Sequence, residues 1–167
     1  VQNSEEKCNQ LSLIHKFISK EEINDFRLKT FHELNKLEWK KILYNNCYGD
    51  IKDLIGPDLL IQKKINLSIQ MPGDTTSILN AHSDCSSGDS PFELVLWIPL
   101  TDAYSSNSMF IYDKQRSTDF YHSIKMQNPI KMYPDKCDFV SVNYGEYIIF
   151  SPSLVHGNVL NTTKSTR

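Results

Sequence analysis

Long apolar segments and an excess of charge of one sign are both missing from this 167-residue sequence. The longest apolar run covers residues 94–100, whereas a membrane-spanning helix needs about 20 such residues. Lys and Arg total 18, Asp and Glu total 20, and the net charge is −2. This near balance gives no general reason to expect a nucleic-acid or membrane partner. Hydrophobic residues make up 40% of the chain, enough for one packed core, so we expect one soluble domain.

Closely spaced cysteines and several familiar catalytic motifs are also absent. The sequence contains no CxxC pair, Walker loop, GxGxxG segment or nucleophile elbow, which gives no support for a zinc ribbon, a P-loop enzyme or a serine hydrolase. The first residues have no apolar segment of the kind found in signal peptides. We therefore expect a reducing, cytoplasmic location with mostly structural thiols, although the sequence leaves a disulfide open. The cysteines concerned are Cys8, Cys47, Cys85 and Cys137.

The pattern of the chain changes near residue 60. Ser19 and Glu22 form an S-x-x-E capping box, and apolar residues then recur at mostly three- and four-residue intervals, which predicts helices. Later segments are short, partly alternating and separated by turn residues, which predicts strands. We expect one domain over residues 1–167, with a helical part at 1–60 and a β core at 61–167. The predicted strands are 65–69, 77–84, 92–101, 108–112, 139–142, 146–150 and 154–156, with a helical excursion at 117–125. Such a series favours a β-sandwich or barrel.

The segment His82-Ser83-Asp84 is the first candidate for chemistry. Residues i and i+2 of a strand point to the same face, so we expect the imidazole and the carboxylate to project together. A facial iron(II) site needs a second histidine, for which His156 is the best candidate. The HxD motif alone is weak evidence, because composition predicts it about 0.4 times in this chain.

Arg167 makes the combination more specific. It follows His156 after ten intervening residues and is one of three arginines in the chain. A downstream histidine with arginine at that interval arises by chance about one time in thirty. The whole pattern is therefore expected by chance in about one per cent of such sequences. The pattern therefore indicates a functional constellation.

The pattern His82-x-Asp84 … His156-x10-Arg167 resembles that of the iron(II)/2-oxoglutarate-dependent oxygenases, and most of all their phytanoyl-CoA dioxygenase-like branch. The supporting segments are residues 94–102, 107–110, 145–146 and 156–158. The last two are also similar to oxygenases of carbohydrate and aminoglycoside (streptomycin-type) biosynthesis clusters. The resemblance covers roughly residues 60 to 167, and the helical part is only generically compatible with it.

The resemblance implies a fold and a ligand set. The fold is a double-stranded β-helix, a jelly-roll, cupin-like barrel; because the family's closing strand begins near the arginine and the sequence stops at Arg167, we expect that strand to be missing. His82, Asp84 and His156 would bind iron(II), and Arg167 would bind the distal carboxylate of 2-oxoglutarate. Arginine suits that role because its planar fork grips a carboxylate with two hydrogen bonds.

Two further residues fall where relatives line the cosubstrate pocket, namely Trp97 and Asn158. For Trp97 the alternative is a barrel-core aromatic. Asn158 lies two residues beyond His156 and so on the same face of an extended segment. The other histidines, His15, His32 and His122, are expected to be ordinary surface or helix residues.

The activity that the resemblance implies is hydroxylation of an unactivated C–H bond with 2-oxoglutarate and dioxygen as cosubstrates. Asp84 argues against a halogenase, in which a small residue replaces that carboxylate. The alternatives are a non-catalytic cupin-like jelly roll that binds a metal or a carbohydrate, and a structural barrel with coincidental residues. Residues 85–91 and 103–107 are rich in Ser, Asp and Asn, which favours a hydroxylated or sugar-like small molecule as substrate.

Overall fold

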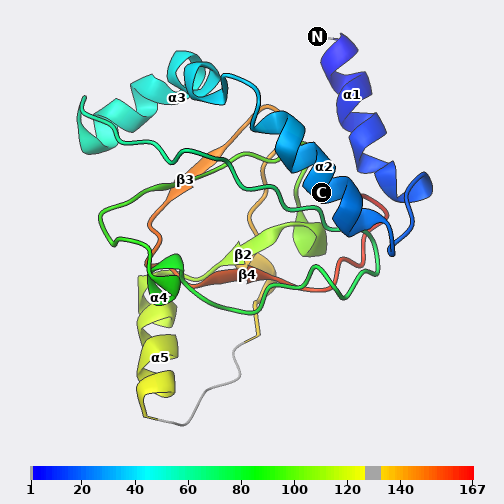
Figure 1. Cartoon of the computed structure of the whole chain (residues 1–167). Helices are drawn as coiled ribbons and strands as arrows, with labels where there is room; N and C mark the ends of the chain where they lie inside the picture. The colour runs from blue at the N-terminus through cyan, green and yellow to red at the C-terminus, as the bar shows by residue number, and fades with distance from the viewer. Residues whose placement is uncertain (1, 127–132) are drawn as a thin grey trace. The chain divides into compact units, whose positions relative to one another are not determined.

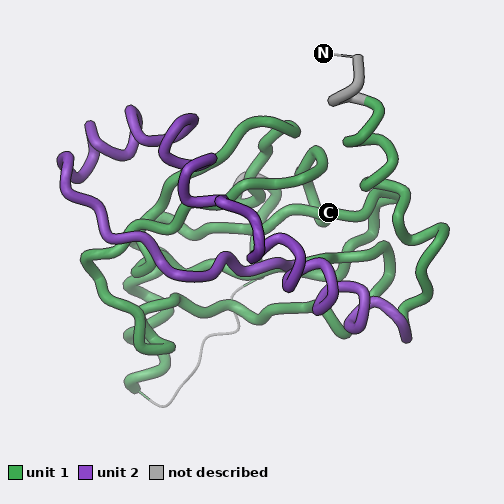
Figure 2. The backbone as a smooth tube through the Cα atoms, turned by 45° about the horizontal axis from the view of Figure 1, so that its top comes forward, with its two compact units in different colours: residues 1–20, 69–167 green, residues 21–68 purple. Residues whose placement is uncertain are grey.

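A computed structural model describes residues 2–126 and 133–167, and its chain divides into two compact units. The larger unit comprises residues 1–20 and 69–167, and the smaller comprises residues 21–68 (Figure 2). The larger unit therefore holds every residue that the sequence singles out for chemistry.

The smaller unit is helical, as the apolar spacing predicts. It contains α2 (Ile23–Leu34) and α3 (Trp39–Ile55), and α3 ends at Gly56, whose φ of +94° suits glycine. The helix starts later than the predicted capping box implies, because α2 begins at Ile23 with Glu22, and not Ser19, in the N-cap position. Residues 56–68, at the end of this unit, have no helix or strand.

The larger unit combines helices with very short strands (Figure 1). Its strands form two antiparallel pairs, β1 with β3 and β2 with β4. Its elements are α1 (Gln2–Ser12), α4 (Asp84–Ser87), β1 (Val95–Trp97), β2 (Met109–Ile111), α5 (Lys114–Lys125), β3 (Ile148–Phe150) and β4 (His156–Asn158), with 3₁₀ turns at Ile14–Lys16, Ser105–Asn107 and Lys136–Asp138. The helix predicted at 117–125 is confirmed as α5.

The core of the larger unit lies around β2 and the segment before β4. Phe110, Tyr112 and Val155 are buried and pack together, and Phe120 and Tyr121 of α5 contact them. Burial of such side chains contributes about 1.5–3 kcal/mol each. α5 is thus anchored to the segment that leads into His156.

The mainly-β, jelly-roll prediction is wrong. The structure is 39% helical and 10% strand, and the described residues form two two-stranded sheets and no barrel. The predicted strand 65–69 is not a strand, and 77–84 and 139–142 contribute only isolated bridges. The four strands that do form are shorter than predicted or, for β4, shifted along the chain.

Side-chain amides explain part of this difference, because they occupy backbone groups that a strand ladder would use. Asn35 donates to the Ile65 carbonyl and accepts from the Ile65 amide. Asn158 does the same across Ser77 and Leu79, accepting from the Leu79 amide at 2.5 Å and donating to the Ser77 carbonyl at 3.0 Å. Period-two patterning records which residues are half-buried, and does not show whether a backbone or a side chain satisfies the peptide groups.

None of the helices in residues 2–126 and 133–167 is both long enough and apolar enough to cross a membrane.

Candidate metal centre

The two histidines of the predicted site are directly opposite each other. The His82 amide donates to the His156 carbonyl at 3.0 Å, and the His156 amide donates to the His82 carbonyl at 2.8 Å. Residues that exchange both hydrogen bonds in an antiparallel pair project their side chains from the same face. The imidazole rings accordingly lie 4.5 Å apart, centroid to centroid.

Asp84 joins them although it is not on a strand. Ser83 is extended, with φ −122° and ψ 151°, so the side chains of residues 82 and 84 emerge on the same side. Ser83 itself is fully buried and caps α4 by accepting from the Ser86 amide. His82 and Asp84 therefore lie on the same side of the extended residue Ser83, as their i, i+2 spacing predicts. The strand predicted at Asp84 is wrong, because α4 begins there.

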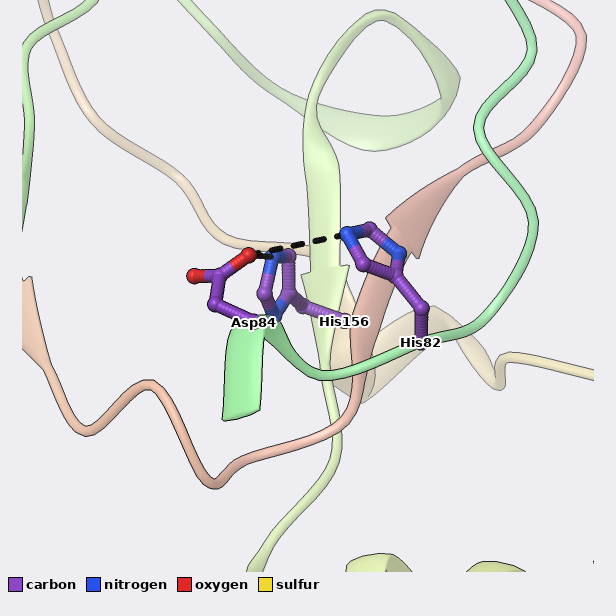
Figure 3. A group of neighbouring side chains, drawn as sticks. All are labelled: His82, Asp84 and His156. Atoms are coloured by element: carbon purple, nitrogen blue, oxygen red, sulfur yellow. Dashed lines mark ion pairs between the residues drawn. The ribbon is translucent and has the colours of Figure 1, made fainter. Parts of the chain in front are cut away.

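The three ligand atoms converge on one point (Figure 3). Asp84 Oδ1 lies 3.7 Å from His82 Nε2 and 3.5 Å from His156 Nε2, and all three atoms lie within 4.8 Å of one another. His156 is buried, whereas the side chains of His82 and Asp84 keep about a quarter of their exposure. The structure thus brings together all three residues that the sequence pairs as metal ligands.

Backbone carbonyls set the orientation of both rings. His82 Nδ1 lies 2.8 Å from the Asn80 carbonyl oxygen, and His156 Nδ1 lies 3.0 Å from the Leu154 carbonyl oxygen. A carbonyl only accepts hydrogen bonds, so each Nδ1 must carry the proton. In a neutral imidazole the lone pair is then on Nε2, which is the atom that faces Asp84. This arrangement fixes the tautomer that a metal-binding histidine needs.

The resulting cluster contains acceptors without a donor. Two Nε2 lone pairs and a carboxylate oxygen face each other, and only a proton or a cation between them makes the arrangement favourable. Burial lowers the pKa of His156, an effect that the Leu154 carbonyl and the charge of Asp84 oppose and the neighbouring His82 reinforces. The neutral, ligating form of His156 is therefore favoured at neutral pH.

This donor set fits a divalent transition metal. Two imidazoles and one carboxylate are ligands for non-haem iron(II), and the same set also accepts zinc, manganese or nickel. Among the described residues, no other group of His, Cys, Asp or Glu side chains has this spacing.

Gly157 and Asn158 hold the segment before His82 against β4. A Cβ at Gly157 would lie 2.7 Å from the Leu79 carbonyl oxygen and 3.1 Å from that of Asn80. The absence of a side chain at Gly157 therefore allows the backbone of residues 79–80, just before His82, to approach β4 closely. Asn158 binds the backbone of residues 77 and 79 with both ends of its amide.

Arg167 lies with the other predicted pocket residue, Trp97. The guanidinium carbon is 5.4 Å from the centre of the Trp97 ring, and Nη2 donates to Gln70 Oε1 at 3.3 Å. The Gln70 side-chain amide in turn donates to the Val159 carbonyl, next to β4. Arg167 Nε is buried without a hydrogen-bond partner. No acidic side chain of the described residues forms a salt bridge with this arginine.

Arg116 is an internal reference for Arg167. Its guanidinium also covers an aromatic ring, Tyr112, at 4.2 Å, but it donates to both carboxylate oxygens of Asp138. Burial tends to lower the pKa of Arg116, but the hydrogen bonds and charge of Asp138 outweigh it and raise that pKa. For Arg167, burial lowers the pKa to about 10. Arg167 therefore stays charged at neutral pH without the carboxylate that such a group requires.

The remaining candidates are not members of the metal-ligand group. His122 is exposed on α5, and His15 Nδ1 lies 2.8 Å from Thr166 Oγ1. Cys85 Sγ lies 3.4 Å from Ser153 Oγ. Sequence reasoning assigned no role to Gln70 or Gly157, because their roles depend on which segments approach each other.

Comparison with protein-family models and with curated proteins gives no match for this chain.

Proposed function

We propose that this protein is an iron(II)- and 2-oxoglutarate-dependent dioxygenase that hydroxylates a small molecule. His82, Asp84 and His156 are the metal ligands in this proposal. When bound, iron(II) would supply the dioxygen chemistry at the coordination positions that three protein ligands leave open. The chain's own residues orient the ligands, bind the cosubstrate and hold the surrounding backbone.

The observation that carries the proposal is the convergence of three acceptor atoms with both Nδ1 atoms tied to carbonyls. A structural cluster of this composition would be expected to include a donor, such as a lysine or a hydroxyl group. The fixed tautomers instead leave both Nε2 lone pairs available to one ion.

Arg167 supports the choice of a keto-acid cosubstrate. A partly buried arginine whose Nε is enclosed without a hydrogen-bond partner, and which has no carboxylate partner, has unused capacity for an anion. The distal carboxylate of 2-oxoglutarate has the planar, two-oxygen shape that an arginine fork binds best.

The substrate class in the proposal is a hydroxylated or sugar-like molecule. It depends on the polar composition of residues 85–91 and 103–107. Hydroxyl-bearing ligands are recognised by such side chains through hydrogen bonds, whereas a long acyl chain requires an apolar lining.

The test is a combined binding and turnover experiment. Under anaerobic conditions, iron(II) or manganese(II) should raise the Tm, and 2-oxoglutarate should raise it further only when metal is present. Each ligand at 100 times its Kd adds about 2.7 kcal/mol of stability. In air, the protein with iron(II) should then convert 2-oxoglutarate to succinate. Among a panel of hydroxylated small molecules, a substrate should raise the succinate yield above the yield without it.

Three results separate the alternatives. No stabilisation by any divalent ion rejects the metal centre. Stabilisation by metal without an added effect of 2-oxoglutarate, and without succinate, favours a non-catalytic metal-binding protein. Succinate release that depends on both iron and the protein supports the oxygenase proposal.

A further inference from the structure

The face of α5 toward the metal-ligand segments carries two hydroxyl groups one helical turn apart, on Ser117 and Tyr121. Residues i and i+4 of a helix lie on the same face. Ser117 is buried and Tyr121 is partly buried. Neither residue touches the metal ligands' side chains, yet both contact the backbone or side chains of residues adjacent to them.

Tyr121 connects the two segments that carry the ligands. Its hydroxyl donates to Ser83 Oγ and lies 3.3 Å from the Ser153 carbonyl oxygen. Ser83 stands between His82 and Asp84, and Ser153 precedes His156 by three residues. The hydroxyl thus fixes the spacing between the segment of the first two ligands and the segment of the third.

Ser117 controls the peptide group that orients His156. Its Oγ accepts from the Val155 amide at 3.0 Å. This amide and the Leu154 carbonyl belong to the same peptide unit, which is planar and trans, so the two groups point in opposite directions. Because the Leu154 carbonyl accepts from His156 Nδ1, anchoring the amide at Ser117 sets the direction of that carbonyl and hence of the His156 ring.

We propose that Ser117 and Tyr121 are positioning residues of the metal centre, which make α5 the element that holds the two ligand-bearing segments in register. This inference rests on the proposed metal centre but not on oxygenase activity. Replacing a residue that orients a metal ligand from outside the coordination sphere typically lowers metal affinity by about 10- to 100-fold.

The probe is cobalt(II), whose visible absorption reports the number and geometry of its ligands. Tyr121→Phe keeps the ring and removes only the hydroxyl; Ser117→Ala removes the other. Each should weaken cobalt binding by roughly 10-fold and shift the visible bands. Thr118→Val is the matched control on the same helix, because the Thr118 hydroxyl is exposed and donates only to the Lys114 carbonyl of α5 itself. Tyr44→Phe in the smaller unit controls for loss of a phenol hydroxyl.

A merely structural role would lower the Tm of Tyr121→Phe and Ser117→Ala but leave the cobalt affinity and spectrum of the folded protein unchanged, and that result would overturn the inference. A wild type that binds no cobalt would overturn both this inference and the proposed function. A wild type that binds cobalt but releases no succinate with iron rejects the oxygenase alone, and the cobalt affinities of the variants still decide the role of α5.

Discussion

The metal-ligand cluster and the arginine cluster of the larger unit have opposite deficits. His82, Asp84 and His156 present three acceptor atoms to one another with no donor among them. Arg167, with Gln70 and Trp97, presents a partly buried cation with an enclosed, unpartnered Nε–H and no acidic partner among the described residues. A cation would complete the first cluster and an anion the second.

The two clusters together are more specific than either cluster alone. An isolated group of acceptors occurs at many protein surfaces, and an arginine without an acidic partner can be hydrated. Both deficits in one compact unit, connected through Gln70 to the residue after β4, match a pair of ligands of opposite charge. Metal and keto-acid are such a pair, and variants that affect one without the other test this reading.

Removal of Asp84 should have the largest effect. Asp84→Ala removes the only charged ligand, so stabilisation by iron(II) or manganese(II) and succinate release should both be lost. The fold should remain, because the side chain is partly exposed and its removal leaves no core cavity. Thermal unfolding with and without metal measures whether the fold remains and whether the metal still stabilises it, and a succinate assay measures turnover.

Asp89→Ala is the matched control for this change. Asp89 is exposed in the same loop, and its amide, which the substitution keeps, is what binds the Asp84 carbonyl. Unchanged metal stabilisation in Asp84→Ala would show that the ion is held elsewhere.

Arg167→Lys should separate the two clusters. Lysine keeps the charge and loses the two-pronged geometry. Loss of a charge-assisted hydrogen bond costs about 1.5–3 kcal/mol, which corresponds to roughly 10- to 150-fold weaker binding of 2-oxoglutarate. Metal affinity should stay the same, since the arginine is not a ligand. Isothermal titration into the manganese-loaded protein measures the cosubstrate affinity, with Arg27→Lys in the smaller unit as control; equal affinities in Arg167→Lys and wild type would remove Arg167 from the site.

The convergence of His82, Asp84 and His156 followed from the sequence, whereas most of the fold around them did not. His82 and Asp84 are brought to one side by a single extended residue, Ser83, which needs no strand. The helices at 23–55 and 114–125 also followed from apolar spacing or a helical excursion in the pattern.

The failures have a common physical cause. The predicted β core assumed that alternating segments pair through their backbones, whereas Asn35 and Asn158 satisfy several of those groups with side chains. Gly157 was missed because its importance depends on the distant carbonyls of Leu79 and Asn80, which only the tertiary structure brings close. Local pattern records burial and propensity, but these contacts depend on tertiary arrangement.

Gly157→Ala should affect the metal cluster through the backbone. The added Cβ would overlap the Leu79 carbonyl oxygen, so residues 79–80 must move, and overpacking of this kind costs about 1–3 kcal/mol. The Asn80 carbonyl that orients His82 moves with them, so metal affinity should fall as well. Gly49→Ala in α3 is the control: nothing lies within 4 Å of its added Cβ, and alanine should stabilise the helix by about 0.5–1 kcal/mol. Chemical denaturation should show a lower free energy of unfolding for Gly157→Ala and a higher one for Gly49→Ala. Stabilisation by Gly157→Ala would contradict the close approach.

Trp97→Leu should have the smallest effect and decides which role the ring has. A cation–π contact at 5.4 Å contributes about 0.5–1 kcal/mol, so its loss should weaken 2-oxoglutarate binding by roughly 2- to 5-fold and leave metal binding unchanged. The other tryptophan, Trp39, is buried at the start of α3 in the smaller unit, and Trp39→Leu should lower stability without any change in cosubstrate affinity. Titration of 2-oxoglutarate and denaturation of both variants distinguish the two cases. If Trp97→Leu behaves like Trp39→Leu, the ring is a packing residue and the arginine cluster consists of Arg167 and Gln70 alone.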